Sequence, residues 1–205
     1  MLIGLCGGMK AGKDTAFRLL DEMGAPATER RAFAEPMKES FCEFLGITRE
    51  DFETNKRNKN ARITFTVDGE VTADYTLREA IQRYGDEAHR QVFGELFWVD
   101  LTLPFEVEHS DTTLCVTDAR YYNEMQRVRD LGGYNVLIRR TEPVDEATEV
   151  SAAHSSETSI DMSLVDYIID NTEFDDDFET YKTQLQIVLD DIQKTEERPH
   201  DDHSE

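Results

Sequence analysis

The residues best suited to chemistry lie in one glycine-rich segment, "GLCGGMKAGKDT", which runs from Gly4 to Thr15. It contains the pattern G-x-x-x-x-G-K, whose glycines let backbone N–H groups turn inward around phosphate oxygens. The helix expected to follow adds its positive end, and the Lys13 ammonium can reach the terminal phosphates. We therefore expect a nucleoside triphosphate site made by Gly7, Gly8, Met9, Lys10, Ala11, Gly12, Lys13, Asp14 and Thr15.

Asp14 departs from that pattern, because the position after the lysine ordinarily carries a hydroxyl that binds Mg²⁺. Here the hydroxyl is displaced to Thr15. A carboxylate beside a triphosphate is repulsive unless a cation lies between them, and Mg²⁺ favours one or two carboxylates with phosphate oxygens and water. We expect Mg²⁺ beside Asp14 and Thr15, with Asp14 touching it directly or through water and Thr15 donating to a phosphate. The alternative is a glycine-rich turn that merely caps a helix, with Asp14 favourable in the first turn.

Two further charged residues stand at the end of the segment "TTLCVTD" and two positions beyond it. Asp118 is placed to bind Mg²⁺ or its waters, or to orient an arginine; alternatively it caps the following helix. Arg120 can grip a phosphate through two hydrogen bonds, or it can form a surface ion pair.

The segment "TLREAIQRYGDEAHRQVFG" is expected to be a long helix with several candidate ligands for an acceptor. Its three arginines are five and seven residues apart, which does not place all of them on one side of a helix. We expect at least one of them to face a phosphate and the others to lie on the solvent-exposed side. Gln82 can read the edge of a base through its amide, or be an ordinary helix position. Phe93, Phe97 and Trp98 are expected in the core rather than as a stacking platform. The candidate substrate-binding arginines are Arg78, Arg83 and Arg90.

Short apolar segments alternate with helical patterns along the chain, which predicts a mostly parallel sheet covered on both faces. Ligands of such sheets collect at the carboxyl ends of the strands. The expected strands are residues 1–7, 30–36 (stopping at Pro36), 112–118, 134–140 and 165–171. The expected helices are residues 13–24, 37–45, 76–94, 96–109 (broken near Pro104), 120–133 and 172–194.

We expect residues 1–193 to form one domain that carries two inserted segments. Residues 46–76 are charged and aperiodic and then alternate around Asp68-Gly69, which predicts an insertion or substrate flap with a hairpin. Residues 140–160 form a long loop of the kind that closes over a ligand. Residues 194–205 are expected to be a disordered acidic tail.

Composition excludes several classes of function. With 22 basic against 44 acidic residues in 205, the net charge of −22 disfavours a free nucleic-acid-binding module. Cys6, Cys42 and Cys115 are widely spaced and are expected to be reduced core residues. No apolar run approaches the roughly 20 residues that span a bilayer. We expect no membrane partner and a cytoplasmic location, that of the host cell if the chain is viral.

The motifs "GGMKAGKDT", "FAEPMKE", "LREAIQRYGDEAHR…FWV", "VTDARYYNEM" and "HSSETSIDMSLVDYIIDN", in this order, resemble the phage deoxynucleoside monophosphate kinases. The likeness covers most of residues 1–190 and is weakest at residues 46–76. It implies a three-layer α/β/α fold of the P-loop NTPase type, with a mostly parallel central sheet and inserted substrate or lid segments. It also implies a phosphate-binding role for Lys13 and Arg120, a place on the ATP side for Arg140, and a substrate-side role for Lys38. The catalytic set expected is Lys13, Asp118, Arg120 and Arg140.

The resemblance implies an ATP- and Mg²⁺-dependent enzyme that passes the γ-phosphoryl group to a deoxynucleoside monophosphate. One alternative is a related kinase that phosphorylates a hydroxymethylated base in phage DNA, the only reading with a nucleic-acid partner. A non-enzymatic alternative is a nucleotide-binding switch. The accepted base, and whether two copies form a homodimer, are left open.

Overall fold

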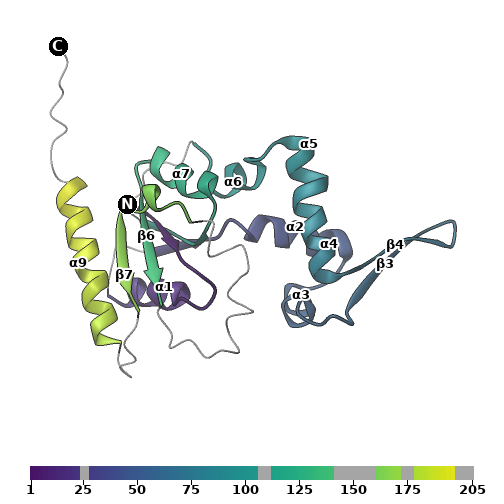
Figure 1. Ribbon diagram of the computed structural model, residues 1–205, viewed down its shortest axis with the longest axis horizontal. Coiled ribbons are helices and arrows are strands. Elements are labelled where there is room, and N and C mark those ends of the chain that lie inside the picture. The colour runs from purple at the N-terminus through teal and green to yellow at the C-terminus, as the bar shows by residue number, and fades with distance from the viewer. Residues whose placement is uncertain (24–27, 106–111, 141–159, 172–177, 197–205) are drawn as a thin grey trace, which may run out of the picture. The chain divides into compact units, whose positions relative to one another are not determined.

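The computed structural model describes residues 1–23, 28–105, 112–140, 160–171 and 178–196 (Figure 1). By its internal contacts the chain divides into two compact units. Unit 1 comprises Met1–Ala32 and Glu106–Glu205, and unit 2 comprises Phe33–Phe105. The expected lid-like loop lies outside the described residues except at its two ends, and so does the expected tail beyond residue 196.

Unit 1 is built on a parallel five-stranded sheet of order β2-β5-β1-β6-β7. Its strands are β1 (Leu2–Cys6), β2 (Thr28–Arg31), β5 (Thr113–Ala119), β6 (Tyr134–Arg139) and β7 (Tyr167–Asp170). Every residue of β1 is buried, as expected of a central parallel strand with both faces covered. The helices are α1 (Lys13–Glu22), α7 (Tyr122–Asp130), the 3₁₀-helix η2 (Met162–Leu164) and α9 (Glu179–Glu196).

The two faces of the sheet are covered by different helices (Figure 1). Ile3 and Leu5 of β1 share one buried cluster with residues of α1 and α9. The intervening Gly4 faces the other way, and a Cβ added to it would lie 3.1 Å from the Val128 side chain of α7. Because side chains of a strand alternate between faces, α1 and α9 cover one face and α7 the other. The expectation of a three-layer α/β/α arrangement is confirmed.

One strand boundary differs from the sequence prediction. The strand expected at residues 30–36 instead spans Thr28–Arg31, and Pro36 lies in the first turn of helix α2 (Glu35–Leu45). Proline is favoured at that position because it fixes a helical φ and lacks only an N–H that would have no intrahelical partner. Pro36 therefore marks the beginning of a helix rather than the end of a strand.

Unit 2 packs α2 against α3 (Arg49–Asn55), the hairpin β3 (Arg62–Val67) and β4 (Glu70–Thr76), and α4 (Leu77–Gly85) around a small core. Asp68 and Gly69 both have positive φ, at 52° and 83°, as a tight hairpin turn of two residues requires. This confirms the hairpin. Thr76 and Glu79 form a capping box that fixes the beginning of α4.

The long helix expected from residue 76 continues as a π-helical turn η1 (Asp86–Arg90) and α5 (Gln91–Phe93). Gly94, with φ of 106°, ends it, and α6 (Phe97–Thr102) follows and stops before Pro104. Gly85 lets α4 approach α2 closely, since a Cβ there would lie 2.3 Å from the Met37 sulfur.

Trp98 is buried and donates from Nε1 to the Gly85 carbonyl at 3.0 Å, as a core role predicts. Phe93 was expected in the core and is not, since it is 63% exposed. Its ring stacks on that of the less exposed Phe97, with ring centres 5.1 Å apart, although Gly94 places the two residues in different helices; Phe93 is thus the solvent-facing member of this pair.

Cys6, Cys42 and Cys115 are free and buried, which confirms the expectation of reduced core thiols. Within the described residues, none of the helices combines the length and the apolar character that crossing a membrane requires.

Candidate functional site

The glycine-rich loop joins β1 to α1 at the carboxyl end of the central strand of unit 1. Gly7 has φ of 140°, and a Cβ there would lie 2.4 Å from the Ile138 carbonyl oxygen of β6. Gly12 has φ of 107° and precedes the first residue of α1. Only glycine fits both the positive φ and the close approach, so the backbone itself, not side chains, lines this loop.

Three side chains hold the loop by its carbonyl groups. Arg140 Nη1 donates to the Lys10 carbonyl at 3.3 Å. Asn171 Nδ2 donates to the Ala11 carbonyl at 2.9 Å, and the Tyr181 hydroxyl donates to the Gly12 carbonyl at 3.1 Å. A peptide group points its C=O and N–H in opposite directions, so carbonyls held on one side turn N–H groups to the other. The arrangement suits an anion on the inner side of the loop.

Lys13 begins α1 and is almost fully buried, with 8% of its surface exposed. Its Nζ atom donates to the carbonyls of Gly7 and Gly8, both at 2.7 Å. The pKa of Lys13 is lowered to about 8, mainly by burial and next by the charge of Arg120, while Asp14 and Asp118 act in the opposite direction. These effects indicate that Asp118 and Arg120 lie within electrostatic reach of the Lys13 ammonium.

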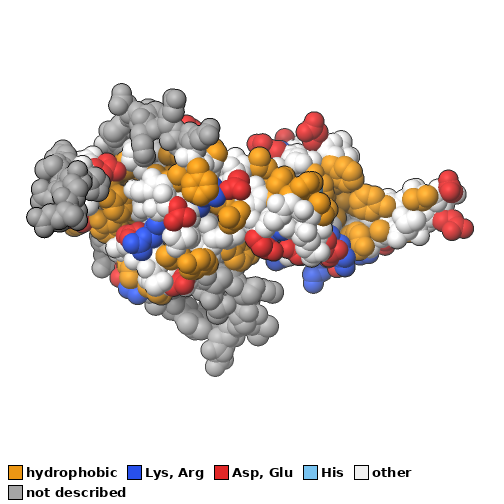
Figure 2. Space-filling view, turned by 90° about the horizontal axis from the view of Figure 1, so that it is seen from above, with side chains coloured by type: hydrophobic (Ala, Val, Ile, Leu, Met, Phe, Trp, Pro, Cys, Tyr) orange, Lys and Arg blue, Asp and Glu red, His pale blue; other side chains and the backbone are white. Residues whose placement is uncertain are grey.

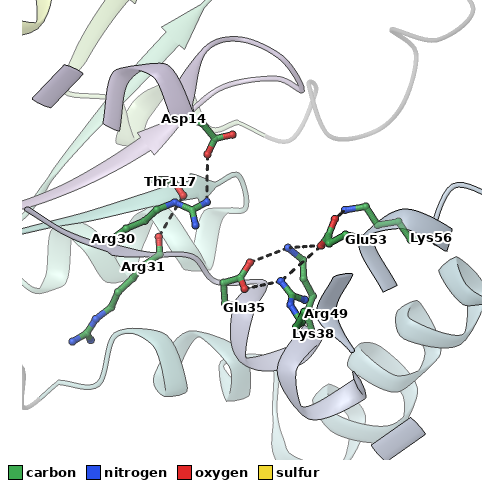
Figure 3. Close-up of polar contacts among 9 residues, drawn as sticks. All are labelled: Asp14, Arg30, Arg31, Glu35, Lys38, Arg49, Glu53, Lys56 and Thr117. Carbon is green, nitrogen blue, oxygen red and sulfur yellow. Dashed lines mark hydrogen bonds and ion pairs between the residues drawn. The ribbon is translucent and has the colours of Figure 1, made fainter. Parts of the chain in front are cut away.

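Asp14 has a cationic partner from the neighbouring part of unit 1. Arg30, in β2, brings its Nη2 atom to 3.3 Å from Asp14 Oδ1 (Figure 3). The Asp14 side chain is 87% exposed, so its carboxylate remains open to solvent and to a ligand. The carboxylate that sequence reasoning expected to need a metal is thus accompanied by a guanidinium.

A magnesium ion fits the residues of the loop in a limited way. Among the described residues no three His, Cys, Asp or Glu side chains gather to hold a metal. Mg²⁺ characteristically takes only one or two carboxylates and completes its shell with phosphate oxygens and water. Asp14 and Thr15 supply a carboxylate and a hydroxyl at the first turn of α1, and Asp118 adds a carboxylate near Lys13. This donor set suits a metal that arrives with a nucleotide rather than a resident ion.

The carboxyl end of β5 carries Asp118 and, just beyond the strand, Arg120. The following helix α7 has Tyr121 at its N-cap, and the Glu124 carboxylate accepts from the backbone N–H groups of Arg120 and Tyr121 at 2.9 and 3.1 Å. Asp118 is therefore not the cap of this helix, which removes the structural alternative considered for it. Glu124 also fixes the backbone from which the Arg120 side chain extends.

In unit 2, Lys38 belongs to a charged cluster that joins α2 to α3 (Figure 3). Lys38 Nζ lies 3.0 Å from Glu35 Oε1 and 3.8 Å from Glu53 Oε1. Arg49 Nη2 lies 2.7 Å from Glu35 Oε2 and 3.7 Å from the same Glu53 oxygen. Lys56 also pairs with Glu53. Two carboxylates, Glu35 and Glu53, thus hold three cations close together.

The four candidates on α4 and η1 are not brought together. Arg78 and Gln82 are exposed on α4, four residues apart and therefore on one face of that helix. Arg83 donates from Nη1 to both carboxylate oxygens of Glu87 at 2.8 Å, and its guanidinium lies 4.9 Å from the centre of the Tyr75 ring. Arg90 ends η1 and is half-buried.

Four residues of these contacts were not predicted from the sequence. Asn171 and Tyr181 hold loop carbonyls, and Arg30 and Arg49 pair with carboxylates. For Asn171 a usable signal existed, because it directly follows β7 and the carboxyl ends of parallel strands share one edge of a sheet. The other three gave no local signal.

No protein-family model matches the chain. The sequence is 26% identical over 176 residues to a protein of Acanthamoeba polyphaga mimivirus that is provisionally named a deoxynucleotide monophosphate kinase, covering 80% of this chain and 88% of the other.

Among solved structures, the chain is similar to dephospho-CoA kinase from Campylobacter jejuni, with a TM-score of 0.50 and 13% identity over 95% of this chain and 98% of that one. It is also similar to shikimate kinase from Acinetobacter baumannii, with a TM-score of 0.47 and 12% identity over 96% and 95%. The first of these likenesses confirms the fold class. The chain thus has the three-layer α/β fold of that kinase, with the parallel five-stranded sheet in unit 1.

Proposed function

We propose that the protein is a deoxynucleoside monophosphate kinase, which transfers the γ-phosphoryl group of ATP to a deoxynucleoside monophosphate with Mg²⁺. One observation carries this proposal: three carbonyls of the glycine-rich loop are held by side chains around a buried lysine. The mimivirus relative supports the choice of acceptor, since it bears the same activity in its name. Net charge of −22 makes a nucleic-acid acceptor less favourable than a small one.

In this mechanism unit 1 binds the donor. The loop N–H groups and the positive end of α1 bind the triphosphate, and Lys13 exchanges its bonds to the Gly7 and Gly8 carbonyls for bonds to phosphate oxygens. Asp14, Thr15 and Asp118 are the residues that would hold Mg²⁺ or its waters, and the ion would supply positive charge against the phosphates. Arg120 contributes positive charge beside Lys13, as phosphoryl transfer requires.

The acceptor is proposed to depend on residues of unit 2. Lys38, Arg49 and Lys56 outnumber the two carboxylates that hold them, so their cluster offers an anion a net positive charge. Arg78 adds a guanidinium on the exposed face of α4. Gln82 remains a candidate reader of the base, and Arg90 a further cation. A phosphate acceptor is already anionic near neutral pH, so no general base is needed. Catalysis then consists of charge neutralisation and in-line placement.

The test is a screen of common deoxy- and ribonucleoside monophosphates with ATP and Mg²⁺, in which new diphosphates are measured. We expect at least one deoxynucleoside monophosphate to be converted, and Lys13→Ala to lower turnover by about 100-fold or more while circular dichroism shows an unchanged fold. Near-normal turnover by Lys13→Ala would refute the assignment.

Two parallel measurements separate the alternatives. Duplex DNA containing hydroxymethylated bases is offered as acceptor beside the mononucleotides, and its preferential phosphorylation would favour a DNA-directed kinase. ADP release in the absence and presence of each acceptor is also compared. A nucleotide-binding switch would hydrolyse ATP slowly at a rate that no acceptor changes.

A further inference from the structure

Unit 2 contains a pocket of about 420 Å³ that the proposed chemistry does not use. Its aromatic walls are Phe44 of α2, Phe65 and Tyr75 of the hairpin, and Tyr84 of α4, and η1 adds Glu87 and Ala88. A volume of this size lies within the range of sites for small organic ligands, which combine an apolar lining with a few polar groups. Figure 2 shows hydrophobic side chains gathered on unit 2 toward the base of the hairpin.

The aromatic rings of this pocket pack at small interplanar angles and leave one ring, that of Phe44, exposed. Phe44 and Phe65 have ring centres 6.5 Å apart and planes 27° apart, and Phe44 and Tyr84 are 5.7 Å and 30° apart. Phe44 is nevertheless 61% exposed, although it is a large apolar side chain. A planar π system seated beside it would bury this ring and stack with it.

The polar groups of the pocket are a donor and an acceptor held side by side. Arg83 and Glu87 both line it, joined by the two bonds from Arg83 Nη1. Both of those bonds come from one nitrogen, so within the contacts described for this pair the other guanidinium hydrogens stay available. The Arg83 guanidinium also lies over the Tyr75 ring, 4.9 Å from its centre, and this cation–π contact favours the same orientation. A nucleobase carries hydrogen-bond acceptors next to donors on its edge, which is the complement of this pair.

We propose that this pocket binds the base of the deoxynucleotide acceptor, with Phe44 as the stacking ring and Arg83 and Glu87 as the groups that read the base edge. The inference rests on the proposed function and names the part of unit 2 that sets its substrate range. An aliphatic ligand would fill the same space but would make no hydrogen bonds with the Arg83–Glu87 pair, and a free phosphate would be repelled by the Glu87 carboxylate. Arg83, which the sequence suggested as a phosphate ligand, is thereby assigned to the base, in place of Gln82, which is not among the residues that line the pocket.

Binding can be followed through Trp98, the single tryptophan of the chain, because its ring lies 6.4 Å from that of Tyr84. The probes are the four common deoxynucleosides, which lack phosphate, and deoxyribose 5-phosphate, which lacks a base. We expect at least one deoxynucleoside to change Trp98 fluorescence with saturation and deoxyribose 5-phosphate to have no such effect. The Phe44→Ala variant should weaken that nucleoside binding by about fivefold or more, the lower range for loss of one base–aromatic stack.

Kinetics provide the second arm. Phe44→Ala removes the stacking ring, and Ala88→Trp fills the pocket from its other wall without removing any charge. Both should raise KM for the deoxynucleoside monophosphate by about tenfold while KM for ATP stays unchanged. Phe105→Ala is the matched control, since Phe105 is a phenylalanine of similar exposure, 66%, outside the pocket lining. Glu87→Gln should change the order of preference among the four bases.

The outcomes separate this inference from the proposed function. Unchanged KM for the deoxynucleotide in both Phe44→Ala and Ala88→Trp, with normal kinase activity, would overturn the base pocket and leave the kinase proposal standing. Nucleoside binding that Ala88→Trp abolishes without any effect on KM would likewise reject the assignment to the acceptor. If the wild-type protein phosphorylates no mononucleotide, the proposed function fails instead, whatever Trp98 reports.

Discussion

Arg30 Nη2 lies 3.3 Å from Asp14 Oδ1, so the carboxylate that follows the loop lysine is paired with a guanidinium from β2. The pair is exposed, with 45% and 87% of the two side chains accessible, and an ion pair of this kind contributes only about 0 to 1 kcal/mol. A divalent ion could therefore displace it at little cost. The charge of Asp14 is balanced by an arginine in this structure and, in our proposal, by Mg²⁺ when a nucleotide is bound.

This relationship predicts opposite effects of two substitutions on the requirement for Mg²⁺. Asp14→Ala removes a candidate metal ligand and should raise the Mg²⁺ concentration for half-maximal turnover by about tenfold. Arg30→Ala removes the competing cation and should lower that concentration. The measurement is a Mg²⁺ titration of turnover at saturating ATP, with thermal unfolding as a check on the fold. An Asp14→Ala curve that overlays the wild-type curve would reject the metal role.

The hydroxyl of Tyr181 offers a separate test of how the loop is held. Tyr181→Phe deletes only the bond to the Gly12 carbonyl, which is worth about 0.5 to 1.5 kcal/mol. If that bond positions the loop, KM for ATP should rise by about two- to tenfold while KM for the acceptor stays constant.

Tyr167→Phe is the matched control for this substitution. It also deletes one tyrosine hydroxyl bond, here to Asp191 on α9 at 2.8 Å, and does not touch the loop. Equal changes in KM for ATP in the two variants would mean that Tyr181 acts through general stability rather than through the loop.

Some features of this site could be read from the sequence because their causes are local. The loop from Gly7 to Lys13 follows from glycine spacing and an apolar run, and the hairpin follows from Asp68-Gly69. The alternation of strands and helices was enough to predict the parallel sheet and the edge at which Asp118 and Arg120 emerge.

Other features depend on contacts between distant parts of the chain. Tyr181 is 169 residues from Gly12, and Asn171 is 160 residues from Ala11, so neither spacing nor composition links them to the loop. Arg30 was hidden by a misplaced strand, since only the register of β2 against β5 decides which side chains of "TERR" face Asp14. Arg49 lies in the segment that the family pattern matches least.

Lys38 and Arg49 pair with the same two carboxylates, those of Glu35 and Glu53. If the two cations bind the acceptor phosphate, loss of either one should raise KM for the acceptor. Lys38→Met and Arg49→Met should each raise KM for the deoxynucleoside monophosphate by about tenfold, because a hydrogen bond to a charged group contributes about 1.5 to 3 kcal/mol. KM for ATP should stay constant. Lys59→Met serves as control, since Lys59 is exposed and lies outside the cluster. Equal increases for both substrates would indicate a structural role for the cluster in joining α2 to α3.

The buried thiols of unit 1 predict a loss of stability in alkaline solution. Burial raises the pKa of Cys115, and likewise of Cys6, from 9.0 to about 12. Between pH 9 and pH 12 the unfolded chain loses thiol protons that the folded chain keeps, so the stability that these thiols contribute below pH 9 is lost as pH rises. Each thiol should lower the free energy of unfolding by about 1.4 kcal/mol at pH 10 relative to pH 8.

Urea unfolding at pH 8 and pH 10 measures this effect. Cys115→Ala should reduce the difference between the two pH values by about 1.4 kcal/mol, although the substitution also lowers stability at both by leaving a small cavity. Alkylation gives an independent reading, since iodoacetamide should label Cys6 and Cys115 at pH 9 only when urea unfolds the chain. Rapid labelling of Cys115 in the native protein would contradict its burial in β5, and a pH difference that Cys115→Ala leaves unchanged would contradict the raised pKa.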